Sequence, residues 1–313
     1  MARPLRIEYP GAFYHVIQRG NERKAIFISE QDRTKFYEYL AALHTRYKVN
    51  IHTYCLMNNH YHLILETKNA NLAKAMHCLN TSYTVYFNVK RKRAGHLFQG
   101  RYTAILVEAD EYLHQLSRYI HLNPVRIGLV KDPADYPHSS YKYFISNSTS
   151  PDWLNKGFIL SLFDSNANKA KSLYKKFVLE GIGNETDIIR KNMSFGFLLG
   201  SSEFVEDIKA RFIEGRQDEE IPVLKAAQPQ LNPEDIKQTV IKKIVNTKLS
   251  RTIGIYLIRK HTSLSLKEIA ALFGKISDAG VSALYNRVGK KRIANKRLNG
   301  RIKEIEKMLK IET

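Results

Sequence analysis

The first 107 residues alternate two hydrophobic periods in a regular order. Apolar runs bounded by Gly, Asn and Pro predict β-strands at 12–17, 49–56, 60–67 and 102–107. Apolar residues at helical spacing predict helices from Ser29 to about Lys48 and from about Asn71 to Lys92. The resulting order, β-α-β-β-α-β, is that of a ferredoxin-like layer, in which two helices pack on an antiparallel sheet.

The middle of the chain has weaker patterns. A third helix is predicted over roughly 110–123, and Pro124 is expected to stop it because proline has no backbone N–H to donate. A polar stretch at 146–151 resembles a boundary, and short helices are expected within 155–180 and at 201–214.

The helical signal returns strongly after Ser250, with an apolar helix around 253–258. The sequence from Ser265 to Glu268 is a capping box that opens a second helix ending near Gly274, and a third helix begins around Ser277. Two helices joined by a glycine-bearing turn are typical of a helix-turn-helix.

These patterns predict an α+β fold with three parts. A ferredoxin-like domain is expected at 1–148, a helical connecting segment at 149–244 and an all-α helix-turn-helix domain at 245–313.

Charge separates the two ends of the chain from its middle. The protein has a formal net charge of +20 and a pI of about 9.7. Residues 1–148 carry 20 Lys and Arg against 11 Asp and Glu, residues 149–240 carry 12 against 14, and residues 241–313 carry 18 against 5. Two basic ends indicate a polyanionic partner, with nucleic acid favoured over a membrane surface.

The two cysteines, Cys55 and Cys78, have no paired spacing, so neither a disulfide framework nor a thiolate zinc site is indicated. No apolar run reaches the length of a membrane span, and the first residues lack the apolar core of a signal peptide. We therefore expect a cytoplasmic protein with no membrane partner.

Candidate chemistry begins with His60-Tyr61-His62 on the third predicted strand. Successive side chains of a strand point to opposite faces, so His60 and His62 share one face while Tyr61 points the other way. Two imidazoles on one rigid strand can hold a metal ion, although most His-x-His sequences are structural. In a basic protein, a metal ion indicates phosphodiester chemistry on nucleic acid.

Tyr119 and Asn123 lie four residues apart and therefore share one face of the third helix. If that face meets the histidine strand, Asn123 can supply a third, oxygen ligand, and Tyr119 lies beside a metal-bound phosphate. Attack by the phenol would form a covalent phosphotyrosine, which keeps the phosphodiester energy available for rejoining. His15, on the first strand, is expected to be packed or hydrogen-bonded rather than a ligand.

His60-Tyr61-His62 is the His-hydrophobe-His motif of the HUH nucleases. With the block from Arg118 to Arg126, it resembles the single-tyrosine transposases, specifically the REP-associated tyrosine transposases. Further similar blocks are residues 1–11, Arg19-Gly20-Asn21, Phe98-Gln99-Gly100-Arg101-Tyr102 and Ser139-Ser140-Tyr141.

This resemblance implies a ferredoxin-like HUH domain in which His60 and His62 bind a divalent ion, Asn123 completes the site and Tyr119 is the nucleophile. The ion is Mg²⁺ or Mn²⁺, and two imidazoles favour Mn²⁺. The implied substrate is single-stranded DNA, often beside a hairpin, and the implied product is a 5′-phosphotyrosine with a free 3′-hydroxyl. Relatives of this kind act as monomers or homodimers.

Several cations are candidates for holding DNA phosphates, because Arg and Lys are the usual phosphate ligands. They are Arg101, Arg118 and Arg126, and the basic run Lys90, Arg91, Lys92 and Arg93. For each of the three isolated arginines, a solvated or ion-paired role is an equal alternative.

The C-terminal block 264–274 resembles the duplex-binding domain of the replication initiator DnaA, which implies that Ser277 to Arg287 is a recognition helix on duplex DNA. Where the initiator has an Asp-His-Ser/Thr-Thr-Val run, this chain has Ser277-Asp278-Ala279-Gly280-Val281, so the resemblance implies the architecture but not the base specificity.

Two other functions stay open at this point. A DNA-binding regulator with an inactive HUH fold would not need all four residues His60, His62, Tyr119 and Asn123. A metal-dependent hydrolase that activates water would not need Tyr119.

Overall fold

The computed structural model describes residues 6–183, 192–212, 231–262 and 264–309, so the first five residues of the opening family block lie outside it. The chain divides into two compact units within α9 (Ser202–Phe212), one ending at Ile208 and the other starting at Lys209. Each unit is described by itself. Within the described residues, no helix is long and apolar enough to cross a membrane.

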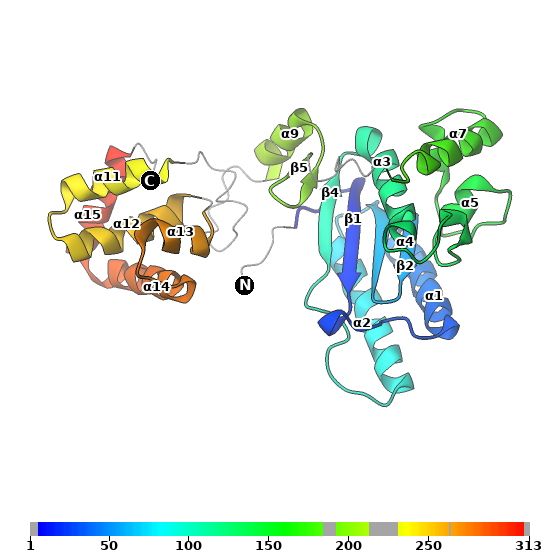
Figure 1. The fold of residues 1–313 in the computed structure, drawn as a ribbon, viewed down its shortest axis with the longest axis horizontal. Coiled ribbons are helices and arrows are strands. Elements are labelled where there is room, and N and C mark those ends of the chain that lie inside the picture. Colours follow the sequence, from blue (N-terminus) through cyan, green and yellow to red (C-terminus); the bar gives the residue numbers. More distant parts are fainter. Residues whose placement is uncertain (1–5, 184–191, 213–230, 263, 310–313) are drawn as a thin grey trace. The chain divides into compact units, whose positions relative to one another are not determined.

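The N-terminal unit is built on a mixed sheet with the strand order β2-β3-β1-β4-β6-β5. Its four main strands are β1 (Ala12–Arg19), β2 (Val49–Met57), β3 (His60–Thr67) and β4 (Thr103–Val107). Each neighbouring pair among these four is antiparallel, and β2 and β3 form the hairpin joined at Asn58-Asn59. The predicted ferredoxin-like order is confirmed (Figure 1).

The helices α1 (Glu30–Tyr47) and α2 (Leu72–Lys90) pack on one face of this sheet. Tyr61 shows which face, because its ring lies 4.9 Å from that of Phe36 on α1 and its hydroxyl donates to Asn80 Oδ1 on α2 at 2.7 Å. The strand alternation therefore directs the histidines on either side of Tyr61 to the opposite face.

The opposite face carries α3 (Ala109–His121), followed closely by the short helix α4 (Asn123–Arg126). Leu113, Leu116 and Ile120 of α3 are fully buried in a core shared with β2, β3 and β4. α3 ends at His121, two residues before the expected end, so Pro124 is not the residue that stops it. It is the second residue of α4, where proline is tolerated because an N–H in the first turn has no partner inside the helix.

The middle of the chain adds to this unit instead of connecting two domains. The hairpin β5 (Met193–Ser194) and β6 (Leu198–Leu199) extends the sheet, with β6 parallel to β4. Helices α5 (Tyr141–Ile145), α6 (Gly157–Ser161) and α7 (Ala167–Leu179) pack beside α3 and one another. Two short 3₁₀ turns, at Asn21–Arg23 and Pro133–Asp135, complete the unit.

The C-terminal unit is helical. Its helices are α11 (Pro233–Lys243), α12 (Thr247–His261), α13 (Leu266–Phe273), α14 (Asp278–Ala294) and α15 (Lys296–Met308). The expected capping box is present at Ser265 and Glu268. Because α11 packs on α12, the segment expected as a connector at 149–244 is shared between the two units.

A buried carboxylate joins three of these helices. Glu306 on α15 lies 3.1 Å from Lys260 Nζ and 3.1 Å from His261 Nε2, both on α12, and 3.0 Å from Arg292 Nη2 on α14. Burial raises the pKa of Glu306, but the hydrogen bond from His261 and the charges of Lys260 and Arg292 outweigh it and lower the pKa to about 2. The carboxylate is therefore ionised at neutral pH and neutralised within the unit.

The Ser265 cap gives a test of the C-terminal fold. Ser265→Ala removes the side-chain acceptor of the Glu268 N–H, and we expect it to cost about 1 kcal/mol of local stability. Ser265→Asp keeps an acceptor and should leave stability nearly unchanged. Amide hydrogen exchange of α13 measures both, and equal exchange in Ser265→Ala and the wild type would contradict the assignment.

A candidate active site between strand β3 and helix α3

His60 and His62 project from the same face of β3, as predicted, and their ring centroids lie 5.0 Å apart. His62 is buried, with 4% of its surface exposed, and His60 is half-buried. The site therefore has one imidazole inside the sheet–helix interface and one at its edge.

The Nδ1 atom of each histidine is held by a neighbouring side chain. Asn59 Oδ1 lies 2.7 Å from His60 Nδ1, and His15 Nε2 lies 3.0 Å from His62 Nδ1. The Nε2 atoms are thus the ones that can face a ligand. Burial, with the nearby charge of Arg19, lowers the pKa of His60 to about 4. Burial and then the neighbouring His15 and His60 hold the pKa of His62 well below its usual range, so both rings are neutral at pH 7.

Tyr119 lies beside His62 and His15. The centroid of its ring is 6.1 Å from that of His62 and 6.1 Å from that of His15. The guanidinium carbon of Arg126 lies 4.2 Å from the same ring, in cation–π geometry, and Arg126 Nη1 donates to the Tyr119 carbonyl oxygen at 3.4 Å. The phenol is partly exposed, so a substrate can reach it.

Asn123 lies one turn after Tyr119, and 8% of its surface is exposed. Its Nδ2 donates to the carbonyl oxygens of Tyr119 at 3.0 Å and Ile120 at 3.5 Å. The amide oxygen is then the atom available to a ligand. Across the described residues, no group of three or more His, Cys, Asp and Glu side chains is arranged to hold a metal, so an ion at His60 and His62 needs a third donor of another type.

A buried histidine fixes the helix that carries Tyr119. His121 Nδ1 lies 2.7 Å from the Tyr174 hydroxyl of α7, and its Nε2 lies 2.8 Å from Ser140 Oγ. Ser140 in turn bonds the backbone of Tyr54 on β2. His121 thus ties α3 to the sheet and to α7.

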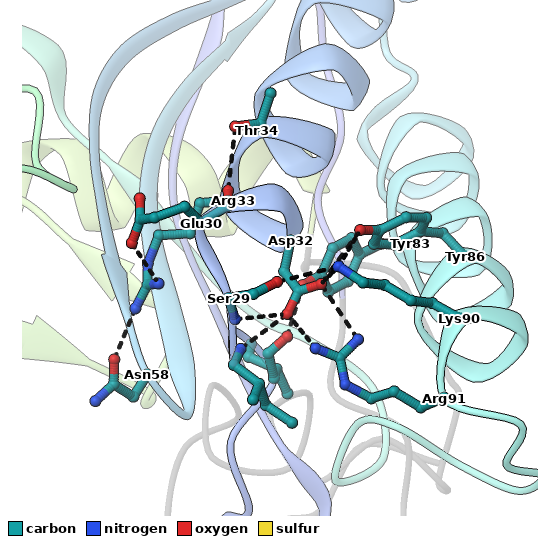
Figure 2. A network of polar contacts seen from close by, with 12 residues as sticks. Ser29, Glu30, Asp32, Arg33, Thr34, Asn58, Tyr83, Tyr86, Lys90 and Arg91 are labelled. Atoms are coloured by element: carbon teal, nitrogen blue, oxygen red, sulfur yellow. Dashed lines mark hydrogen bonds and ion pairs between the residues drawn. The ribbon is translucent and has the colours of Figure 1, made fainter.

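The predicted basic run divides into two pairs. Lys90 and Arg91 bind the buried carboxylate of Asp32 on α1 (Figure 2), with 2.9 Å from Lys90 Nζ to Asp32 Oδ1. Their charges are therefore paired with that carboxylate. Lys92 and Arg93 are exposed, although Arg93 also donates to the His96 carbonyl oxygen at 3.2 Å.

The other DNA-binding candidates also divide into side chains that are engaged within the protein and side chains that are exposed. Arg118 lies 4.1 Å above the Phe177 ring and bonds Gln115, so its guanidinium packs against α7. Arg101 is exposed just before β4. In the C-terminal unit, Ser277 caps α14 by accepting from the Gly280 N–H at 3.2 Å, and Arg287 is exposed on the same helix.

Sequence reasoning did not place His15 and Arg126 around the reacting groups. His15 was expected to be hydrogen-bonded, but its partner depends on β1 lying beside β3, a neighbourhood that no local pattern reveals. Arg126 was expected to hold DNA phosphate, and its stacking on Tyr119 depends on the turn from α3 into α4.

Residues 9–123 match the family model described as "Transposase IS200 like", a stretch that includes His60, His62 and Tyr119 and ends at Asn123. Over this stretch the chain is similar to that transposase family. A curated protein of Haemophilus influenzae named "Putative REP-associated tyrosine transposase" is 29% identical over 144 residues, covering 39% of this chain and 82% of the relative.

A solved structure of a REP-associated tyrosine transposase bound to a REP hairpin is also similar, at 16% identity and a TM-score of 0.42. The match covers 50% of this chain and 92% of that chain.

Asp32 gives a test of the interpretation of Lys90 and Arg91. Its carboxylate also accepts from the N–H groups of Ile28 and Ser29, each at 2.9 Å. Burial raises the pKa of Asp32, but the bonds from Arg91, Lys90 and the two N–H groups outweigh it and hold the pKa well below its usual range.

Asp32→Asn places an amide donor against these donors, and we expect a loss of about 1–3 kcal/mol of stability at pH 7. Because the folded-state pKa is lowered, the wild type begins to lose this contribution as the pH falls below about 4, so the difference in stability between the two proteins should narrow between pH 4 and pH 3. Chemical denaturation between pH 7 and pH 3 measures this. Glu38→Gln, an exposed carboxylate on the same helix, is the matched control, and an equal loss in it would contradict the assignment.

Proposed function

We propose that the N-terminal unit cuts and rejoins single-stranded DNA through a covalent bond between Tyr119 and a DNA phosphate. The observation that carries this proposal is the position of the Tyr119 ring, 6.1 Å from the ring of His62 on the shared face of sheet and helix. A transposase needs a nucleophile beside a group that binds the scissile phosphate, and the residues proposed for both roles lie in the stretch that matches the family model.

The donors fit a divalent cation. Neutral imidazoles offer Nε2 lone pairs at His60 and His62, and the amide oxygen of Asn123 provides a third donor of the hard type. We propose Mg²⁺ or Mn²⁺ as the cofactor, with Mn²⁺ better suited to two nitrogen ligands. A bound ion would polarise a non-bridging oxygen of the phosphate and stabilise the charge that builds up on it.

The transfer balances without any further reagent. Tyr119 Oη forms a bond to phosphorus, the bond from phosphorus to the 3′-oxygen breaks, and the phenolic proton is lost as the leaving 3′-oxygen gains one. The products are a 5′-phosphotyrosine and a 3′-hydroxyl. Arg126, whose guanidinium lies over the Tyr119 ring, favours the developing phenolate and orients the ring. Attack of a 3′-hydroxyl on the phosphotyrosine reverses these steps and rejoins the strand.

The substrate proposed for this unit is single-stranded DNA beside a hairpin, as the sequence resemblance implies. The exposed cations Arg101, Lys92 and Arg93 are the proposed backbone contacts, because each presents its charge to solvent. Lys90, Arg91 and Arg118 are not included, since each is engaged with a side chain of the same chain.

The C-terminal unit is proposed to hold duplex DNA nearby. Its residues 241–313 have 18 basic against 5 acidic side chains, and α14 follows α13 after a short turn, as in a helix-turn-helix. Tethering a duplex-binding unit to the cutting unit raises the local concentration of the target, so modest affinity at each end suffices. The proposal holds for a monomer or a homodimer.

The test of catalysis is covalent capture. Incubation of the full chain with labelled hairpin-bearing single-stranded DNA and Mn²⁺, followed by denaturing electrophoresis, should give a protein–DNA band. Tyr119→Phe should remove the band and lower cleavage by at least about 10³-fold, because the nucleophile is lost. Tyr39→Phe, on α1 behind the sheet, is the matched control and should retain the band.

Each alternative gives a different result. If the DNA is cleaved without a covalent protein–DNA band, and Tyr119→Phe still cleaves it, the protein is a hydrolase that uses water. Binding of the DNA with no cleavage by the wild type would indicate a regulator.

Duplex binding by the C-terminal unit is tested by charge removal on α14. Arg287→Gln should weaken binding to duplex DNA and lower the slope of log affinity against log salt by about 1, because about one fewer counterion is released. Lys303→Gln removes an exposed charge from α15 and is the control. Fluorescence anisotropy over a salt series measures both, and identical slopes in the two variants would argue against α14 as the DNA-facing helix.

A further inference from the structure

A third histidine lies behind the proposed metal ligands. His15 on β1 is 2% exposed, and its ring stacks on that of His62 with centroids 5.2 Å apart and an interplanar angle of 22°. His15 Nε2 makes the 3.0 Å hydrogen bond to His62 Nδ1. In the described structure His15 Nδ1 is buried and has no hydrogen-bond partner. An unpaired polar atom in a core costs stability, so its retention beside the site calls for an explanation.

A hydrogen bond between two neutral imidazoles can run in either direction. In the first arrangement, His62 Nδ1–H donates to His15 Nε2, and the lone pair of His62 Nε2 is free for a cation. In the second, His15 Nε2–H donates to His62 Nδ1, and the proton of His62 lies on Nε2. Only the first arrangement allows His62 to act as a ligand through Nε2.

His60 must also carry its proton on Nδ1 to bind a cation through Nε2, and a single carbonyl acceptor ensures this. Its Nδ1 faces the carbonyl oxygen Asn59 Oδ1, and Asn59 Nδ2 is used in donating to the Arg23 carbonyl oxygen at 3.1 Å. A carbonyl oxygen only accepts, so it fixes the proton of His60 on Nδ1 and leaves Nε2 free. The acceptor for His62 is a ring nitrogen, which can accept only when its own proton lies on the other nitrogen.

We propose that His15 is a positioning residue that holds His62 in the tautomer able to bind the divalent ion. This inference rests on the proposed function, because it assigns His15 a role toward the proposed metal site. The unpaired Nδ1 of His15 is then where the proton of His15 must lie in the metal-binding state. That buried N–H lacks an acceptor because its ring must offer the Nε2 lone pair to His62.

His15 does not act as a ligand itself in this arrangement. Its Nε2 is directed at His62 Nδ1, and the described residues contain no group of three His, Cys, Asp or Glu side chains placed to hold a metal. Its effect on a cation passes through His62, as is usual for the partner of a metal-binding histidine.

Two substitutions separate this role from packing. His15→Gln puts an amide oxygen near the position of Nε2 and keeps an acceptor for His62 Nδ1–H. His15→Leu fills the space with apolar atoms and removes the acceptor. Two quantities are measured on the full-length protein. Electron paramagnetic resonance of free Mn²⁺ gives the affinity for the ion, and the unfolding midpoint without metal gives the stability.

We expect His15→Leu to weaken Mn²⁺ binding about 10- to 100-fold and His15→Gln to stay within a few-fold of the wild type. In His15→Leu, DNA cleavage should recover as the Mn²⁺ concentration rises, which a purely structural defect would not allow. A folded His15→Leu protein that binds Mn²⁺ as tightly as the wild type overturns the inference. If His15→Leu does not fold, His15→Met, which is more flexible and also lacks a comparable acceptor, takes its place.

Failure of the proposed function gives a distinct result. His60→Ala should abolish the Mn²⁺ binding seen with the wild type. If the wild type and His60→Ala bind Mn²⁺ equally, the metal site itself is wrong, whereas a loss in His60→Ala with none in His15→Leu rejects only the role of His15.

Discussion

The alternation of side chains along β3 is the constraint on which the rest of the N-terminal unit depends. Tyr61 points into the core beneath α1 and α2, and its buried ring and hydroxyl are both engaged there. His60 and His62 must then face α3, because a strand cannot turn one residue without turning its neighbours. One face of the sheet thus packs in the core, while the other carries His60 and His62 toward the helix that carries Tyr119.

Buried polar groups position the elements around that strand. His121 fixes α3 through hydrogen bonds to Tyr174 and Ser140, and Asp32 joins the start of α1 to the end of α2. In the C-terminal unit, Glu306 joins α15 to α12 and α14 in the same way. Such groups are costly to bury unless every partner is in place, so each favours one arrangement of its helices over alternatives. The precision that a phosphoryl transfer needs is consistent with this kind of support.

The same groups explain why a count of basic residues overestimates the surface available to DNA. In sequence, Lys90 to Arg93 is a uniform basic run, yet its first two members neutralise a carboxylate more than fifty residues away. Arg118, adjacent to Tyr119 in sequence, points toward α7, whereas Arg126 lies over the Tyr119 ring. The sequence gives the charge of each residue, but the packing of the helices decides which group that charge pairs with.

Local rules were sufficient for most of the regular elements and for which residues share a face within each of them. Periodicity located the four main strands and the long helices, and it placed the two histidines of β3 on one face, because both inferences need only the geometry of a single element. The two-residue strands β5 and β6 are too short for any period, and α15 has few apolar residues, although these lie on one face.

What joins one element to another was decided only by the tertiary structure. The sequence by itself determined that His60 and His62 share a face, and that Tyr119 and Asn123 lie one turn apart. That Tyr119 lies beside His62, that Arg126 stacks on Tyr119 and that His15 bonds His62 follow from the strand order and the packing of α3. The physical reason is that these contacts join segments distant in the chain, whose approach depends on the burial of the whole core rather than on any local preference.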